Sequence, residues 1–423
     1  MAAKHFSNLV VDGRKARFDV SGIDLCIVNS LRRAIMSEVP TAAFPFDVSM
    51  RHTDDGNSGG VLMVRNSSCL NNEFVGHRVS LVPLGFDENQ LHNFQMADYR
   101  FVLKVKNDSC EMRTVTTADF EVFDKNDARL PQSTRDMLFP PCQETGDHVL
   151  LLRLRPGLQC DGNGEEIHME CRAVLGTGRK HARWSPVSSC YFRNKVDDAL
   201  CKASLNAKLE ALSPADTDDL RVETEKQHAA LDAHRCFMRD EYGDPVAFEF
   251  SLECEAPRLR PTYVVFKALS VLRSKLDAIS ASLLETDADE SRVYVDTVPN
   301  MNDFYHVTVL DEDHTLGNMV QGLLYRRWVR DGMGRDVTYI GYFQPHPLEN
   351  NIVFKIKCAV AGDDVRSRFA EGIAWASLQL NDLMMEWITF SKLDKDDIIQ
   401  VKEVLLRADR KRTSAAAVVS RKK

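Results

Sequence analysis

The sequence predicts an α+β fold in which two related domains of one chain pair as an intramolecular pseudodimer, with a β-rich domain inserted in the first. Three observations predict it. A helical pattern that begins at Asp24 recurs from Asp313. The segment 44–178 places short apolar runs between turn-forming residues, which is typical of β-rich domains. Each half also closes with a long helix that carries an apolar seam.

The repeated pattern predicts two amphipathic helices. In the register that aligns Asp24 with Asp313, apolar residues recur every three or four positions in both copies, which places them on one helix face. An aspartate at the start of each helix is expected to cap free backbone N–H groups. Two copies this far apart indicate two related domains rather than a solenoid of stacked repeats.

The two long helices have the spacing of a helix–helix seam, and two such seams suit domains that pack around a pseudo-twofold axis. Each seam could instead pack on the sheet of its own half, and both arrangements can hold at once. Because the halves are joined, pairing needs no second chain, and we expect no homo-oligomer. The predicted pseudodimer interface comprises Leu31, Ile35, Leu269, Leu272, Leu276, Ile279, Leu283, Leu316, Val320, Leu323, Phe369, Ile373, Leu380, Leu383 and Trp387.

Composition limits the class of protein. With 423 residues, of which 27% are charged and 44% hydrophobic, the chain has room for two or three globular domains. We expect no membrane span and no export segment, because no apolar run is long enough. Eleven cysteines without a framework spacing indicate reduced thiols in an intracellular setting.

Changes in composition along the chain predict the domain boundaries. The segment 194–235 is polar and helix-prone, and we expect it to leave the first domain as a helical excursion. The predicted division is a first domain at 1–43 and 179–285 that carries this excursion, the insert at 44–178, a linker at 286–303, a second domain at 304–395, and a charged tail at 396–423.

Three stretches of the first half carry a family resemblance: Asn29 to Thr41 (NSLRRAIMSEVPT), Glu73 to Leu84 (EFVGHRVSLVPL) and His181 to Trp184 (HARW). They resemble signatures of the third-largest subunit of eukaryotic RNA polymerase II and of its archaeal counterpart. In the second half, Asp313 to Met319 (DHTLGNM) and Gly341 to Leu348 (GYFQPHPL) resemble the smaller subunit that partners it in eukaryotes and archaea. Both subunits are related to the bacterial alpha subunit.

The resemblance implies a non-catalytic assembly platform made of two alpha-like dimerisation domains. Such a pair binds the second-largest and largest catalytic polymerase subunits and small zinc-binding subunits. Two partners joined in one chain are known among large DNA viruses, which makes a virus the favoured source. The expected location is then intracellular, in the nucleus or a cytoplasmic viral factory, with packaging in the virion a further option.

Four side chains are candidates for contact with partner subunits. Arg32 and Arg33 are adjacent guanidinium groups off the apolar face of the first repeat helix, and they suit pairing with carboxylates or carbonyls. His77 and Arg78 belong to the second motif of the resemblance. Ordinary solvation of a helix is the plain alternative for the arginines.

We predict no metal and no cofactor. Relatives in the family often hold zinc or an iron–sulfur cluster in the inserted domain. Here that segment has Cys69, Cys110, Cys142, Cys160 and Cys171 without a C-x-x-C pair, so the close spacing that would position two thiolates is absent.

Two other classes of function lack the sequence features that they need. A nucleotide-handling enzyme needs a phosphate loop or metal cluster, and the Gly176 to Trp184 segment departs from the P-loop pattern. Paired acids such as Asp54-Asp55 and Asp396-Asp397 suit solvated loops, so we predict no catalytic residue and no small-molecule substrate. A stand-alone DNA-binding regulator needs a basic face, whereas the net charge is −8, and we expect little direct nucleic-acid contact.

Overall fold

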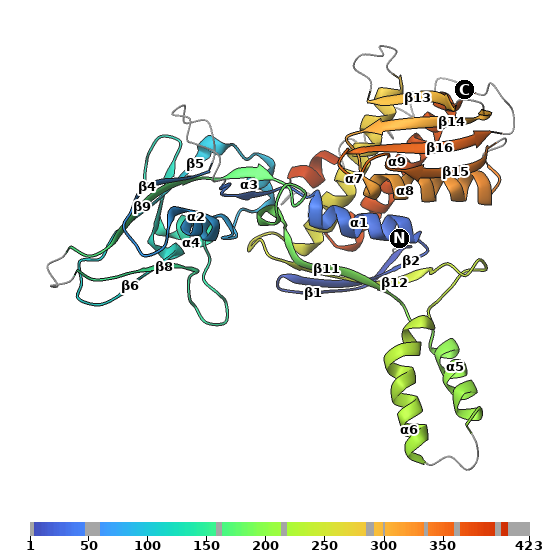
Figure 1. The fold of residues 1–423 in the computed structure, drawn as a ribbon, viewed down its shortest axis with the longest axis horizontal. Helices are drawn as coiled ribbons and strands as arrows, with labels where there is room; N and C mark the ends of the chain where they lie inside the picture. The colour runs from blue at the N-terminus through green and yellow to red at the C-terminus, as the bar shows by residue number, and fades with distance from the viewer. Residues whose placement is uncertain are drawn as a thin grey trace. The chain divides into compact units, whose positions relative to one another are not determined.

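The computed structural model describes residues 4–46, 60–157, 163–212, 218–284, 292–298, 301–333, 337–358, 364–393 and 399–404. These residues fall into two compact units (Figure 1). The first, called the repeat unit, comprises Met1–Ile35, Ser189–Leu252 and Val265–Lys392. The second, called the insert unit, comprises Met36–Ser188, Glu253–Val264 and Leu393–Lys423. The two predicted halves therefore belong to the same compact unit.

The first half has one four-stranded sheet, in the order β1-β2-β12-β11, and two main helices. Asp12 pairs with Lys15 at the β1–β2 turn, where Gly13 has a φ of +55°, a backbone conformation that favours glycine. The elements are β1 (Phe6–Asp12), β2 (Lys15–Ser21), α1 (Leu25–Ser37), β11 (Val187–Asn194), β12 (Ala247–Cys254) and α7 (Pro261–Leu284).

The second half repeats this plan. Its sheet has the order β13-β14-β16-β15, so each half runs β-β-α-β-β-α with its fourth strand between the second and the third. The elements are β13 (Val293–Val298), β14 (Met301–Leu310), α8 (His314–Leu324) continued by the π-helical η6 (Tyr325–Arg330), β15 (Val337–Phe343), β16 (Asn351–Cys358) and α9 (Val365–Phe390).

The β13 strand lies where the sequence analysis placed a linker. Its residues pair with β14 from Val293 opposite Val309 to Val298 opposite Met301. The strand has six residues and lies at the edge of the sheet. Val293 is buried, and the other five side chains are partly or fully exposed. An edge strand of this kind gives a weak apolar pattern, which explains why composition alone missed it.

The insert unit is rich in β-strands. It has a four-stranded sheet in the order β4-β9-β5-β7 and two-stranded sheets β6-β8 and β10-β3. Buried phenylalanine rings at its centre include Phe44, Phe101 and Phe139. Its elements are β3 (Thr41–Ala43), β4 (Gly60–Asn66), α2 (Asn72–Ser80), α3 (Glu88–His92), η1 (Met96–Asp98), β5 (Tyr99–Lys106), β6 (Arg113–Thr116), η2 (Thr117–Asp119), β7 (Phe120–Asp124), α4 (Gln132–Leu138), β8 (Leu150–Leu154), β9 (Glu166–Arg172), β10 (Val174–Gly176) and η3 (Ala182–Trp184).

The polar segment after β11 forms a helical hairpin that belongs to the repeat unit. It contains α5 (Asp198–Glu210), α6 (Asp218–Gln227), the π-helical η4 (His228–Asp232) and the short η5 (Ala233–Arg235). Figure 1 shows α5 and α6 beside one another, beyond the ends of β11 and β12. A bridge between Val196 and Phe237 joins the two ends of the hairpin.

Within the described residues, no helix is both long and apolar enough to cross a membrane. Several sequence predictions concern residues outside the described ranges. These are the acid pairs Asp54-Asp55 and Asp396-Asp397, Cys160, and residues 405–423 of the predicted charged tail.

Candidate functional site at the interface of the two halves

The two repeat helices contact each other directly through polar side chains. Ser30 Oγ of α1 donates a hydrogen bond of 2.9 Å to the Thr315 carbonyl at the start of α8. Arg33 Nε donates to Thr315 Oγ1, also at 2.9 Å. Asp313 caps α8 by accepting from the Thr315 N–H at 2.8 Å, and its other oxygen lies 3.8 Å from Arg33. The start of α8 is therefore held by the middle of α1.

The opposite ends of these helices also meet. Arg326, just after α8, donates to the carboxylate of Asp24, just before α1. Asp24 therefore holds the other half of the chain, whereas Asp313 caps its own helix as predicted. Gly322 lies so close to Cys26 that a Cβ at position 322 would be 2.8 Å from Cys26 Sγ. The two helices run antiparallel across the interface.

These contacts have the reciprocity of a twofold interface. In the register that aligns Asp24 with Asp313, Cys26 corresponds to Thr315 and Arg33 corresponds to Gly322. The contact between Arg33 and Thr315 is thus the twofold partner of the contact between Gly322 and Cys26. A pair of surfaces in which residue i meets j and j meets i is the mark of an isologous interface. The chain pairs with itself as a pseudodimer.

The two long helices also contact each other, and they too run antiparallel. Ser377 Oγ of α9 donates to Asp277 Oδ1 of α7 at 2.6 Å, and Arg273 donates to Asn381 at 3.0 Å. At the end of α7, Arg366 Nε donates to the Leu283 carbonyl at 2.9 Å. A guanidinium at this position satisfies carbonyls that lack a partner in the helix and opposes its dipole.

The last turns of α9 pack on the first half's sheet. The Trp387 ring is 0% exposed, and its centroid lies 4.7 Å from that of Phe18 and 5.0 Å from that of Phe6. Backbone contacts fix the same site, because the His5 N–H donates to Glu386 Oε1 at 2.6 Å. The second half's long helix therefore completes the core of the first half.

All fifteen residues predicted for the pseudodimer interface are buried, with exposed fractions of 6% or less. They occupy four helices: Leu31 and Ile35 lie on α1, Leu269, Leu272, Leu276, Ile279 and Leu283 on α7, Leu316, Val320 and Leu323 on α8, and Phe369, Ile373, Leu380, Leu383 and Trp387 on α9. Burial of this kind is expected both from packing on a sheet and from pairing, so for most of these residues the interface role stays a prediction. Trp387 contacts the other half through its ring.

A further contact between the halves, which the sequence did not indicate, joins Arg330 to a turn of the first half. Arg330, at the end of η6, donates to Asp240 at 2.5 Å and to Asp244 at 3.3 Å, in the turn that precedes β12. The guanidinium carbon also lies 3.5 Å from the centroid of the Tyr242 ring. The hydrogen bond from Arg330 lowers the pKa of Asp240. Nothing in the local pattern marks these residues, because charged side chains in turns are usually solvated.

The predicted partner-contact arginines of α1 have contacts within the repeat unit. Arg32 donates two hydrogen bonds to Asn29 Oδ1, from Nε at 3.1 Å and from Nη2 at 3.0 Å. Arg33 binds Thr315 of the other half, as described above. The structure thus gives Arg33 a role between the halves that the sequence did not indicate. Contact of either arginine with a further subunit stays a prediction.

The other two predicted contact residues are exposed on α2 of the insert unit. The His77 ring lies edge-on to Phe46, with 5.4 Å between centroids. Arg78 donates to the Leu150 carbonyl at 3.1 Å. Both side chains retain surface that a partner can reach, and their role in assembly stays a prediction.

His181, the first residue of the third motif, is held by Arg183 two residues further on. Its Nδ1 accepts from the Arg183 N–H at 3.1 Å and from Arg183 Nε at 3.2 Å. Burial, together with the charges of Arg183 and His77, lowers the pKa of His181. The Arg183 guanidinium reaches on to the carbonyls of Phe44 and Phe46. This arrangement positions a loop of the insert unit.

Within the described part of the chain, one group of three metal-ligating side chains converges. It consists of Cys201, His228 and Cys236 of the helical hairpin, whose ligand atoms all lie within 4.8 Å of one another. Of the insert cysteines, Cys69, Cys110 and Cys142 are exposed, and Cys171 is buried in β9.

Fold and interface define a chain of two homologous dimerisation domains that pair through equivalent helices. The family model described as RNA polymerase Rpb3/Rpb11 dimerisation domain matches residues 17–276, and a second model with the same description matches residues 305–383. The chain belongs to the RNA polymerase Rpb3/Rpb11 dimerisation domain family. The predicted fold class is confirmed.

Individual relatives agree with this family. The chain is 27% identical over 266 residues to the DNA-directed RNA polymerases I and III subunit rpac1 of Dictyostelium discoideum, which covers 58% of this chain and 68% of the relative. It is 23% identical over 310 residues to the DNA-directed RNA polymerases IV and V subunit 3B of Arabidopsis thaliana, over 65% of this chain and 90% of the relative. It is 28% identical over 205 residues to the DNA-directed RNA polymerases I and III subunit RPAC1 of Saccharomyces cerevisiae, over 43% of this chain and 54% of the relative.

Proposed function

We propose that this chain is a non-catalytic assembly subunit of a multisubunit DNA-directed RNA polymerase. One observation carries the proposal: two dimerisation domains of this polymerase family lie in one chain and are paired through reciprocal contacts of α1 and α8. A pair that forms within the chain presents a finished surface to larger subunits. It can therefore nucleate the enzyme without waiting for a second small subunit.

The proposal includes the origin of the chain. We infer that it joins the equivalents of two separate subunits, the larger one with its insert and the smaller partner. The division into domains at 1–43 with 179–285, 44–178 and 304–395 belongs to this proposal. So do a large DNA virus as the source and an intracellular location, in the nucleus or a viral factory, with packaging in the virion as an option.

The proposed partners are the second-largest and largest catalytic subunits and small zinc-binding subunits. Arg32 of the repeat unit and His77 and Arg78 of the insert unit are the proposed contact residues, since each has a polar head within reach of the surface. Arg33 is a weaker candidate, because its guanidinium already binds Thr315.

Affinity capture tests the proposal. The whole chain carrying a tag is expressed in the cells that produce it naturally, and captured proteins are quantified by mass spectrometry. We expect both large catalytic subunits in amounts comparable to the bait, and less of them with a His77→Ala, Arg78→Ala double variant. Arg153→Ala, an exposed arginine on β8, is the matched control and should capture as much as the unchanged chain.

A stand-alone DNA-binding regulator is the alternative, and the same material distinguishes it. The purified chain should bind promoter DNA weakly, because its net charge is −8 and phosphate neutralisation needs clustered Lys and Arg. If no catalytic subunit is captured and the chain alone binds DNA tightly and sequence-specifically, the assembly proposal is wrong and the DNA-binding regulator takes its place.

A further inference from the structure

The helical hairpin that follows β11 has almost no apolar core. Neither α5 nor α6 has a buried residue. Between positions 194 and 246, His228 and Cys236 are the buried residues among those that the structure describes. A segment of about 40 residues that buries so little apolar surface usually requires a covalent or metal cross-link to stay folded. The buried residues at its base are of metal-binding types.

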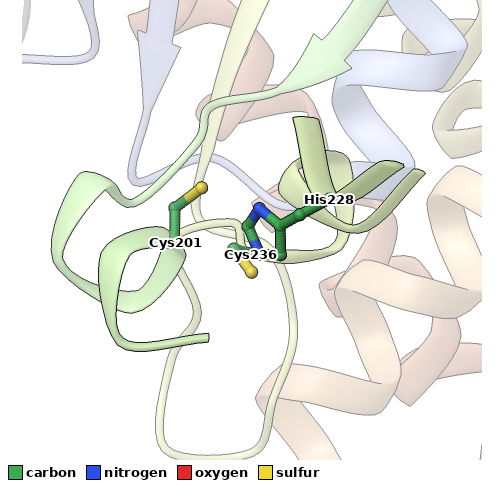
Figure 2. A group of neighbouring side chains, drawn as sticks. All are labelled: Cys201, His228 and Cys236. Carbon is green, nitrogen blue, oxygen red and sulfur yellow. The ribbon is translucent and has the colours of Figure 1, made fainter. Parts of the chain in front are cut away.

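Three segments bring the ligand atoms together at the base of the hairpin (Figure 2). Cys201 lies in the first turn of α5, His228 opens the π-helical η4, and Cys236 follows η5. Their Sγ and ring nitrogen atoms are all within 4.8 Å of one another. Zn–S bonds of about 2.3 Å and Zn–N bonds of about 2.0–2.1 Å separate two ligand atoms of a tetrahedral site by roughly 3.5–3.8 Å. Movements on the order of 1 Å would close the site.

The backbone around the three residues is already fixed by other bonds. Asp197 caps α5 by accepting from the Ala199 and Leu200 N–H groups, and its own N–H donates to the Cys236 carbonyl at 2.8 Å. The entry and exit strands of the hairpin are thereby joined beside the cluster. These bonds place the first turn of α5, which carries Cys201, beside Cys236.

The histidine is also oriented. His228 is 2% exposed, and its Nε2 lies 3.2 Å from the Ser204 hydroxyl, one turn after Cys201 on α5. A polar partner on one ring nitrogen fixes the ring and leaves the other nitrogen for a metal, as is usual around zinc-binding histidines. The π-helical segment that begins at His228 is a further indication of a functional site, since π-helical turns are frequently found at such sites.

We propose that Cys201, His228 and Cys236 bind one Zn²⁺ ion that fastens the base of the helical hairpin. Two thiolates and an imidazole are soft and intermediate ligands, which favour zinc over magnesium or calcium. On binding, each thiol releases its proton to solvent, and water fills the fourth tetrahedral position. This site departs from the sequence expectation of no metal. It lies outside the insert, whose five cysteines include no C-x-x-C pair.

The sequence gives little warning of this site. The ligands follow the spacing C-x26-H-x7-C, which has no close pair and resembles no common zinc motif. Only the fold of the hairpin brings the first turn of α5 to the exit of η5.

Zinc content of the purified whole chain tests the proposal. The protein is reduced, given one equivalent of ZnCl2 and dialysed, and zinc is measured by elemental mass spectrometry. We expect about one zinc per chain, and a loss of at least fivefold in Cys201→Ser, His228→Ala and Cys236→Ser. His234→Ala, an exposed histidine of the same segment, and Cys69→Ser, an exposed cysteine of the insert, should retain it.

Two further measurements separate lost ligands from lost folding. Cobalt-loaded protein should show the visible bands of a tetrahedral thiolate complex, and these should vanish in the site variants while their far-UV circular dichroism keeps the signal of the repeat unit. Zinc should also slow hydrogen exchange in α5 and α6 of the unchanged chain. Zinc absent from the unchanged chain, zinc retained by His228→Ala, zinc lost with Cys69→Ser, or a Cys201–Cys236 disulfide in the reduced-and-repurified protein would each overturn the proposal.

Discussion

Replacing Trp387 by alanine is the strongest single test of how the halves depend on each other. The side chain is fully buried, and it contacts Phe6 and Phe18, which belong to the other half. Truncating a buried tryptophan costs about 3–5 kcal/mol, because transfer energy and cavity formation add. Edge-to-face ring pairs contribute about 0.5–1.5 kcal/mol within such a total. We expect Trp387→Ala to lower the free energy of unfolding by about 3–5 kcal/mol.

Trp375→Ala is the matched control. It changes the same residue type on the same helix, but Trp375 is only partly buried, and its ring faces the Arg327 guanidinium of its own half at 4.5 Å. An exposed cation–π pair is worth about 0.5–1 kcal/mol. The difference between the two variants therefore reports how much more a fully buried tryptophan at position 387 contributes than a half-buried one on the same helix.

Urea unfolding followed by far-UV circular dichroism measures the loss in the free energy of unfolding. Hydrogen exchange with mass spectrometry shows which strands and helices lose amide protection. In Trp387→Ala, the amides of β1 and β2 should lose protection although the changed residue lies in the second half. A Trp387→Ala variant no less stable than Trp375→Ala, or a loss of protection confined to α9, would refute the reasoning.

The remaining predictions concern the contact between α1 and α8. Ser30→Ala removes a buried hydrogen bond to Thr315 and should cost about 0.5–1.5 kcal/mol in urea unfolding; no change would mean that the two helices are not in register. Asp313→Ala removes the cap of α8 and should cost about 1 kcal/mol, whereas Asp313→Asn, which can still cap, should cost less; equal losses would point to the charge. Burial, and secondarily the Asp24 charge, raises the pKa of the Cys26 thiol from 9.0 to about 12. Since the folded state then holds its proton more tightly, Cys26 contributes stability below pH 9 that is lost as pH rises toward 12. Cys26→Ser should flatten the fall in urea midpoint between about pH 8 and pH 10, and an unchanged slope would contradict this.

The repeat was predictable from the sequence because helices have a clear periodic pattern. Ile35 and Leu323 lie at positions that recur every three or four residues, and α1 and α8 form at the expected places. The long helices α7 and α9 follow for the same reason. The residues matched by the two family models, 17–276 and 305–383, include α1, α8 and most of α7 and α9.

The reciprocal contacts between α1 and α8 were harder to predict. The residues at equivalent positions of the two helices are of different types, so the two contacts are made by different side chains. Arg33 reaches Thr315, and its counterpart Gly322 simply leaves room for Cys26. An arginine in α1 and a glycine at the equivalent position of α8 share no sequence pattern that would mark both as interface residues. Asp24 illustrates the same limit: it was expected to cap a helix, and it binds Arg326 of the other half.

Polar contacts from turns were beyond sequence reasoning. The Arg330 contact with Asp240 depends on how the turn before β12 meets η6. The convergence of Cys201, His228 and Cys236 likewise depends on the hairpin's geometry. Spacing in the chain gives no signal when ligands come from separate helices.

An engineered disulfide tests the pairing of the halves most directly. A Cβ at position 322 would lie 3.0 Å from Cys26 Cβ, close to the roughly 3.5–4.5 Å of a disulfide. In Gly322→Cys, mild oxidation at low protein concentration should give a monomer in which Cys26 is bonded to the introduced cysteine, as peptide mass spectrometry would identify. Leu348→Cys, on an 88% exposed position of the second half, should form no bond to Cys26. Failure of the Gly322→Cys chain to cross-link, or cross-linking only between chains, would contradict the intramolecular pseudodimer.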